Sequence, residues 1–148
     1  MFVDDQEYEI VVSVQKHFHA SHALPARPEL HGHLWEVEFS VSGPLDPRTG
    51  MVHDMLDLAK FFDPYVKELD GCNLHECPQF TSDNHLVNTT QQFPTCDTLA
   101  HYFLWRLQPI FREDPRFHNL NLCEISVSIW EEDKSARWGR ATIRPKLR

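Results

Sequence analysis

The amino-acid sequence predicts an α+β fold, with one four-stranded antiparallel sheet and two helices on one of its faces. Three observations predict it: two segments with strand periodicity open the chain, two with helical periodicity follow, and two more strand segments close it. The 148 residues, 41% of them hydrophobic, are enough for one domain with a full core. No repeat or low-complexity segment divides them, so we expect a single domain over residues 1–148.

The first two strands are predicted by alternating side chains, because every second residue of a strand lies on the same face. Residues 9–18 alternate, and one face holds Ile10, Val12, Val14 and Phe18. In the second segment, one face holds His31, His33, Trp35, Val37, Phe39 and Val41. The turn-rich stretch GPLDPRTG (43–50) follows it. We expect the two strands to form an antiparallel pair.

Two segments have the spacing of amphipathic helices. The first begins at Asp54, and its apolar residues lie about one turn apart at Leu58, Phe62, Val66 and Leu69. Pro64 interrupts it, and an interior proline costs about 3 kcal/mol, so we expect a kink or break there. Residues 70–94 are polar and predict a long loop. The second helix begins at Pro94-Thr95 with Thr95 as N-cap, and its apolar stripe is Leu99, Phe103, Leu107 and Ile110.

The last strands are predicted by alternation of Cys123, Ile125, Val127 and Ile129, and by a weaker pattern over 136–143. Cys123 is therefore expected in the core. A four-stranded sheet has two open edges, and edges in native proteins are covered or paired. We therefore expect self-association of the chain, edge to edge, into a ring.

Composition excludes several classes of function. The formal net charge of −8 disfavours general binding to nucleic acid or to an anionic membrane, because both require a basic surface. No apolar run approaches the roughly 18 residues of a membrane span. The first ten residues, MFVDDQEYEI, lack the basic region of a secretory signal, so a cytoplasmic protein is expected. The four cysteines are then expected to be thiols.

Three histidines near the first strand pair predict a metal site. His31 and His33 flank a glycine and project from the same face of a strand. His22 stands one short loop upstream, at the end of the neighbouring strand, and converges on the other two if the strands pair. Three neutral imidazoles and a water are typical of a catalytic zinc site with an open position. The alternative is that these are ordinary strand histidines, since the chain has ten.

Five ordered segments then resemble a known family. They are FHASH, HGHLWEVEFSVSGPLDPRTGMVHDMLDL, LDGCNLHE, FPTCDTLAHYFLWRL and VSIWEEDKSARW. Together they resemble the 6-pyruvoyl-tetrahydropterin synthase and 6-carboxy-tetrahydropterin synthase family from about residue 8 to 143. The resemblance implies the tunnelling fold, with element order β-β-α-α-β-β, and trimers that often stack into hexamers with active sites between subunits.

The resemblance also implies roles for particular residues. His22, His31 and His33 are implied as ligands of Zn²⁺, and Glu131 as the carboxylate that anchors the pterin ring through two N–H donors. The other implied positions are Thr95 and Asp97, which contact the pterin, and Asp70 of an Asp-His proton-transfer pair. The usual substrate in the family is 7,8-dihydroneopterin triphosphate, which loses triphosphate by elimination. A strand-end surface residue at 131 and simple helix capping at 95 are the structural alternatives.

The chain departs from the family at two proton-transfer positions. The family cysteine four residues before the HGH triplet is replaced by Arg27, which could pair with an anionic ligand. The family histidine after Asp70 is replaced by Gly71.

Three explanations remain open. Glu29 could be the base, as in a branch of the family that uses a glutamate and releases 6-hydroxymethyl-dihydropterin for folate synthesis. Cys72 or His75 could reach the site from the following loop. The usual reaction could be lost, which would leave a zinc- and pterin-binding paralogue without catalysis. We predict a zinc-dependent, lyase-type enzyme of pterin metabolism with altered proton-transfer residues.

Overall fold

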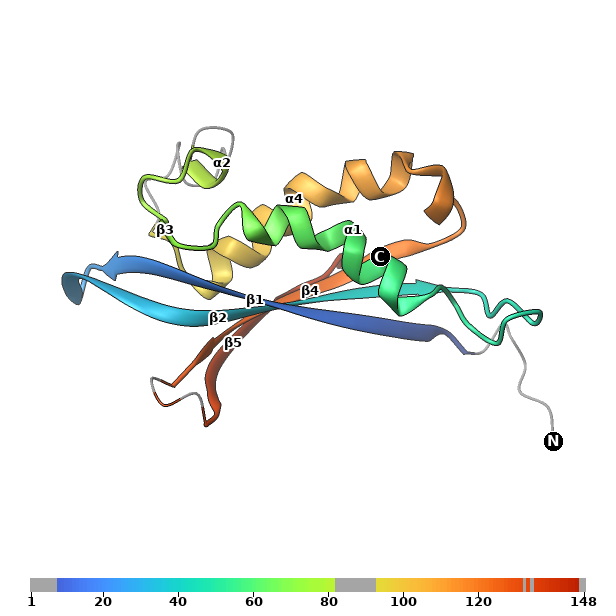
Figure 1. Cartoon of the computed structure of the whole chain (residues 1–148), viewed down its shortest axis with the longest axis horizontal. Helices are drawn as coiled ribbons and strands as arrows, with labels where there is room; N and C mark the ends of the chain where they lie inside the picture. The colour runs from blue at the N-terminus through green and yellow to red at the C-terminus, as the bar shows by residue number, and fades with distance from the viewer. Residues whose placement is uncertain (1–7, 82–92, 132, 134, 147–148) are drawn as a thin grey trace.

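The computed structural model describes residues 8–81, 93–131, 133 and 135–146. It is built on one sheet with the helices packed against one face (Figure 1). The strands are β1 (Ile10–Leu24), β2 (Arg27–Gly43), β3 (Cys72–Asn73), β4 (Asn121–Trp130) and β5 (Arg137–Ile143). The helices are α1 (Met55–Lys67), α2 (Pro78–Thr81), α4 (Cys96–Glu113) and the short 3₁₀ turn η1 (Pro115–Phe117).

The sheet has five strands in the order β3-β1-β2-β4-β5, so the prediction of α+β is confirmed but the count of four is wrong. Neighbours pair antiparallel except β1 and β3, which are parallel. The additional strand is only Cys72 and Asn73, opposite Ala20 and Ser21, inside the segment predicted as loop. Two residues are too few to show a periodic pattern, which explains why the sequence does not predict this strand.

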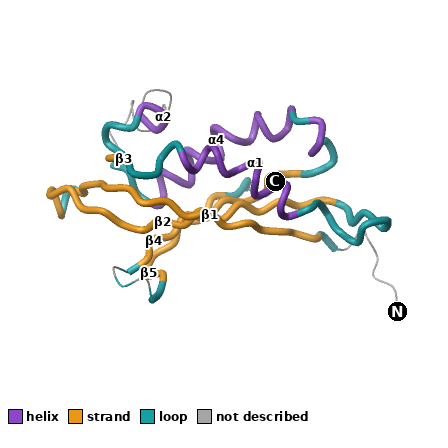
Figure 2. The backbone as a smooth tube through the Cα atoms, viewed as in Figure 1, coloured by secondary structure: helices purple, strands orange, loops and turns teal. Residues whose placement is uncertain are grey.

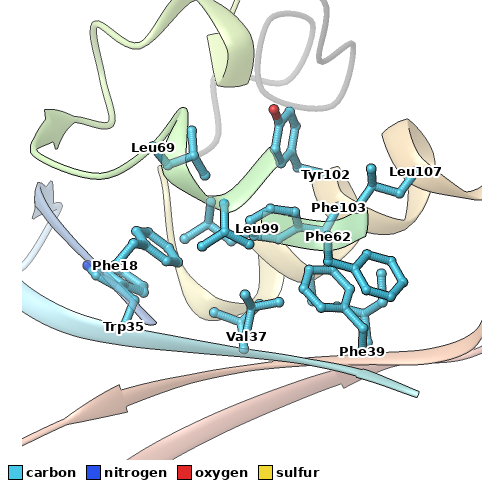
Figure 3. Close-up of a cluster of buried hydrophobic side chains, with 14 of the residues drawn as sticks. Phe18, Trp35, Val37, Phe39, Phe62, Leu69, Leu99, Tyr102, Phe103 and Leu107 are labelled. Atoms are coloured by element: carbon cyan, nitrogen blue, oxygen red, sulfur yellow. The ribbon is translucent and has the colours of Figure 1, made fainter. Parts of the chain in front are cut away.

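The core lies between the sheet and the two long helices (Figure 3). Phe39 of β2 and Phe62 of α1 stack with ring centroids 4.0 Å apart and planes 1° from parallel. Phe103 of α4 meets Phe39 edge to face at 5.8 Å. Because Trp35, Phe39 and Phe62 have no exposed surface, they fix which face of β2 points toward the helices.

The predicted helix starts are confirmed. The Asp54 side chain accepts a hydrogen bond from the Leu56 N–H, and Thr95 forms a capping box with Thr98. The break predicted at Pro64 is wrong, because α1 continues through it to Lys67. Pro64 lacks only the one N–H that would bond back to residue 60, and burial of Phe62 and Val66 on either side of it holds the helix against the core.

The register of β4 shifts between Ser40 and Val41 of β2, where Val41 pairs with Leu122 rather than with Cys123. As a result Leu122 is buried, while Cys123 is half-buried and its thiol donates to the Ser40 carbonyl at 3.4 Å. The core position predicted for Cys123 is therefore wrong. All four cysteines are free thiols, as expected.

The two hairpins leave the helical layer in different directions (Figure 2). The tip of β1–β2 extends past the helices at one end, and the β4–β5 hairpin bends away from them. Within the described residues, no helix has the length and apolar character needed to cross a membrane.

We expect Phe39→Ala to lower the free energy of unfolding by about 3–5 kcal/mol, because it removes the ring that joins α1 and α4 to the sheet. Urea denaturation measures the change. Leu45→Ala is the control: Leu45 is 50% exposed, and surface substitutions stay within about 0.5 kcal/mol. Equal effects of the two substitutions would show that the stacked rings are not central to stability.

Candidate metal centre and adjoining cavities

Three imidazoles meet near the tip of the β1–β2 hairpin. His22 is directly opposite His31, and His33 is opposite Ala20 two residues further along. The ring centroids lie 4.6 Å apart for His22 and His31, 5.1 Å for His22 and His33, and 4.9 Å for His31 and His33. One ring nitrogen from each residue lies within 4.8 Å of the others. The predicted pairing of the strands is confirmed, and it brings the three predicted ligands together as one group, the histidine trio.

Two backbone carbonyls orient the rings of the trio. His22 Nδ1–H donates to the Pro94 carbonyl at 2.6 Å, and His31 Nδ1–H donates to the Glu29 carbonyl at 2.9 Å. Because a carbonyl can only accept, each Nδ1 carries the proton and each Nε2 keeps its lone pair. Both Nε2 atoms are buried and have no hydrogen-bond partner within the described part of the chain. Buried lone pairs without partners are costly, and a divalent cation is the partner that such imidazoles suit.

Burial favours the neutral form of two rings of the trio, those of His22 and His33. Burial lowers the pKa of His22, against the opposing effect of the Pro94 carbonyl, and the charges of His31, His75 and Arg27 lower it further. Burial, with smaller effects of His22, His31 and Arg27, lowers the pKa of His33 to about 4. Imidazole must be neutral to bind a metal, so both shifts favour ligation at neutral pH.

The trio adjoins two cavities. The larger, about 440 Å³ and called the Glu131 cavity here, is lined among others by His33, His19, Cys72, Trp130 and Glu131. The smaller, about 210 Å³ and called the Thr95 cavity, is lined among others by His22, Thr95, Cys96, Asp97 and Trp138. The structure therefore places Glu131 on one side of the trio, and Thr95 with Asp97 on another.

Arg27 and Glu29 lie exposed at the start of β2, beside the trio. His22 pairs with His31, and the next pair toward the tip is Leu24 with Arg27. Between these pairs β1 spans two residue steps, whereas β2 spans four. The two extra residues of β2 form a bulge around Glu29. Bulges change the direction of nearby side chains and often occur beside active sites. Glu29 thus lies in an irregular segment next to His31, and Arg27 is close enough to lower the pKa of His22 and His33.

Asp70 has a structural role that sequence reasoning did not predict. Its carboxylate accepts from the His19 backbone N–H at 2.8 Å, and the Gly71 N–H donates to the His19 carbonyl at 2.6 Å. These bonds fasten the turn after α1 to the edge of β1. Gly71 has a φ of +76°, a left-handed conformation that glycine adopts without strain. The turn explains why a glycine suits the position of the family's histidine.

Both loop residues that could replace that histidine lie against β1, with Cys72 opposite Ala20 and His75 beside Ala23. The Nε2 of His75 accepts the backbone N–H of Ala23 at 2.9 Å, next to His22. Cys72 instead lines the Glu131 cavity, and burial raises the pKa of its thiol. The Cys72 thiolate is therefore disfavoured as a base at neutral pH.

Comparison with known proteins places this geometry in a family. The family described as "6-pyruvoyl tetrahydropterin synthase" matches residues 11–140. The chain belongs to this family. A dihydroneopterin monophosphate aldolase of Pyrococcus furiosus is 33% identical over 109 residues, which are 72% of this chain and 82% of that protein. The human 6-pyruvoyl tetrahydrobiopterin synthase is 37% identical over 65 residues, 43% of each protein. The chain is thus a member of a family of pterin-metabolism enzymes.

Solved structures of the family share the fold. The Caenorhabditis elegans 6-pyruvoyl tetrahydropterin synthase superposes with a TM-score of 0.65 at 17% identity, over 94% of this chain and 97% of that one. The Plasmodium falciparum synthase superposes with a TM-score of 0.58 at 18% identity, over 94% and 99%. These neighbours confirm the predicted tunnelling fold.

The metal-free protein should lose stability as the pH falls from about 6.5 to about 4. The pKa of His33 is about 4 in the folded protein, against about 6.5 for an unperturbed histidine. Between these two pH values the unfolded chain binds more protons than the folded protein does. The free energy of unfolding therefore decreases as the pH is lowered. Urea denaturation with a chelator, at several pH values, measures this. His33→Gln should flatten that part of the curve and His118→Gln, at an exposed position, should not; identical curves for all three proteins would contradict the assignment.

Proposed function

We propose that the chain is a zinc-dependent enzyme that cleaves the side chain of a phosphorylated 7,8-dihydroneopterin. One observation carries the proposal: the histidine trio presents two buried Nε2 lone pairs, without a partner among the residues that the structure describes, and a third imidazole within 4.8 Å. Three neutral imidazoles are the ligand set of catalytic zinc sites that keep a position open. Family membership supports the pterin substrate.

The proposed reaction is an aldolase-type cleavage that yields 6-hydroxymethyl-dihydropterin. The family's cysteine and histidine are replaced by Arg27 and Gly71, while a carboxylate, Glu29, lies beside the trio. The Pyrococcus furiosus relative, which matches 72% of this chain, is named as an aldolase. Elimination of triphosphate is the second candidate, favoured by the synthase relatives.

The zinc ion would be held by His22, His31 and His33, and it supplies Lewis-acid polarisation of a side-chain oxygen. Glu29 accepts the proton of the second side-chain hydroxyl. The bond between the first and second side-chain carbons then breaks, and its electron pair passes into the pterin ring. The second carbon leaves as an aldehyde, and the first carbon takes up a proton to become the hydroxymethyl group.

The remaining residues hold the substrate. Glu131 accepts two N–H donors of the pterin ring, and a carboxylate matches such a parallel pair. Thr95 and Asp97 contact the pterin from the smaller cavity. Arg27 pairs with the phosphate, for which a guanidinium is well shaped. His75, hydrogen-bonded beside His22, is the candidate donor of the returning proton.

We infer further that the protein acts as a homo-oligomer, a trimer or hexamer with its sites between subunits. The residues 10–19 of β1 that lie before β3, and the outer side of β5, leave open sheet edges. Such edges require a cover, and pairing with another copy supplies one.

The metal proposal predicts that His31→Ala and His33→Ala each lose most of the bound zinc. Removing one of three ligands lowers affinity strongly, because the two remaining imidazoles cannot complete the site. Metal analysis after dialysis gives the zinc content per chain. His118→Ala, at an exposed position outside the trio, should retain the full content. Full zinc content in either trio variant would refute the proposed centre.

The reaction proposal predicts that zinc-loaded protein converts 7,8-dihydroneopterin monophosphate into 6-hydroxymethyl-dihydropterin, identified by chromatography and mass spectrometry. Glu29→Gln should lower kcat by about 10²–10⁴-fold, the usual contribution of a general base. Glu113→Gln, an exposed glutamate at the end of α4, is the control.

Other outcomes separate the alternatives. Release of triphosphate from the triphosphate substrate, without the hydroxymethyl product, would favour elimination. Full turnover by Glu29→Gln would remove Glu29 as the base. Absence of turnover on either substrate, combined with tight pterin binding that Glu131→Ala abolishes, would indicate a binding module without catalysis.

A further inference from the structure

Glu36 is a buried carboxylate on the face of β2 opposite the aromatic core. Its neighbours Trp35 and Val37 point into the core, so strand alternation sends Glu36 to the other face. Only 3% of the residue is exposed. Its two oxygens are held separately: Oε1 lies 3.1 Å from His17 Nε2, and Oε2 accepts from Arg137 Nη1 at 2.9 Å.

The Glu36–Arg137 pair crosses a strand. Glu36 lies on β2 and Arg137 on β5, and β4 runs between them. The β4 residue opposite Glu36 is Ser128, a short side chain that is 2% exposed. The ion pair therefore fastens the edge strand β5 directly to β2, beyond the backbone ladder that it shares with β4. Glu36 is buried, and separation from Arg137 would leave its charge uncompensated. This cost keeps Arg137 paired with Glu36.

Arg137 also contacts the wall of the Glu131 cavity. Its guanidinium lies over the Trp130 ring, 5.8 Å from the centroid, and the His17 ring lies 6.1 Å from the same ring. The Trp130 indole N–H is buried and has no hydrogen-bond partner among the described residues. The two groups that contact Glu36, the Arg137 guanidinium and the His17 ring, thus both pack against Trp130.

Glu131 follows Trp130 directly, at the end of β4. Its backbone N–H donates to the Ala136 carbonyl at 2.8 Å, just before Arg137. Its side chain is exposed, with one contact at 3.5 Å to the Ser135 hydroxyl. Among the described residues the side-chain contact is thus weaker than the backbone bond to Ala136, so the position of the carboxylate depends on the hairpin backbone.

We propose that Glu36 and Arg137 are positioning residues for Glu131: they fix Trp130 and the β4–β5 hairpin so that the Glu131 carboxylate meets the pterin ring. This inference rests on the proposed function, in which Glu131 anchors the pterin. Neither Glu36 nor Arg137 lines the Glu131 cavity, so their effect is transmitted through Trp130 and the hairpin backbone.

The chain supplies a matched control in the next rung of the same ladder. Glu38 lies two residues along β2, accepts from Arg140 of β5 at 3.1 Å, and accepts from Gln15 of β1 at 2.8 Å. This pair also joins β2 to β5 across β4, but no ring contact links it to Trp130 in the described structure. Glu38→Gln therefore removes a comparable bridge without touching the wall of the Glu131 cavity, and it leaves Arg140, which lines the Thr95 cavity, in place.

The test measures binding of neopterin, a fluorescent pterin, to the zinc-loaded full chain. Glu36→Gln and Arg137→Gln should each raise the Kd about tenfold, a loss of roughly 1.4 kcal/mol, with zinc content unchanged. Arg137→Lys, which retains a cation for Glu36, should restore part of the affinity. Glu38→Gln should bind as the wild type does. Circular dichroism and urea denaturation check that each variant is folded. If a glutamine variant does not fold, the affinity of Arg137→Lys still tests the inference.

A double-mutant cycle distinguishes positioning from general destabilisation. If Arg137 acts through Glu131, Arg137→Gln combined with Glu131→Ala binds no more weakly than Glu131→Ala alone. Additive losses would overturn the inference, and so would a Glu38→Gln effect as large as that of Glu36→Gln.

Amide hydrogen exchange at Glu131 separates this inference from the proposed function. Exchange should be faster in Arg137→Gln than in the wild type, because the bond to Ala136 opens more often. Suppose that Glu131→Ala leaves the affinity for neopterin unchanged while Arg137→Gln speeds the exchange. The proposed role of Glu131 as pterin anchor would then be wrong, and the role of Arg137 in holding the hairpin would be supported. An unchanged exchange rate in Arg137→Gln would overturn the inference that Arg137 holds the hairpin.

Discussion

The pairing of β1 with β2 in one register is the constraint on which the site depends. His22 faces His31 only because these two residues are Cα partners in the ladder. A slip of one residue would turn His31 and His33 to the opposite face, since strand side chains alternate with a period of two. The register is set by the core, where Trp35 and Phe39 have no exposed surface, and by the Trp35 indole N–H, which donates to the Ala20 carbonyl at 3.0 Å. Burial of apolar side chains thus decides where the imidazoles meet.

A helix cap contributes the second constraint. Thr95 and Thr98 form the capping box that starts α4, and the Thr98 hydroxyl also donates to the Phe93 carbonyl at 2.9 Å. These bonds fix the backbone on both sides of Pro94, whose carbonyl accepts from His22. The local signal that begins a helix therefore also fixes the ring orientation and tautomer of one member of the trio. Thr95 has a structural role here beside its proposed contact with the pterin, so capping and binding are compatible rather than competing interpretations.

Local patterns in the sequence predict most of the fold and the trio, but not the groups around them. Alternation places His31 and His33 on one face, and capping signals locate both long helices, because each of these depends on neighbours within a few residues. Strand β3 depends instead on pairing between Ala20 and Cys72, which are far apart in the chain. The Glu36–Arg137 pair joins residues 101 positions apart. The left-handed φ of Gly71 and the contact of His75 with Ala23 likewise follow from tertiary packing, so no short sequence pattern predicts them.

The two departures from the family pattern change the charge around the trio in one direction. Replacing a cysteine with Arg27 brings a permanent cation near the trio, where it lowers the pKa of His22 and His33. Replacing a histidine with Gly71 removes a titratable group from a turn whose φ of +76° suits glycine. The centre thus keeps its imidazoles, loses a thiol and gains a fixed positive charge. A fixed positive charge can pair with a phosphate that stays on its carbon chain or with one that departs, so Arg27 serves both proposed reactions. The proposed cleavage of a carbon–carbon bond rests instead on Glu29, a carboxylate beside the trio in a chain that has lost the family's thiol.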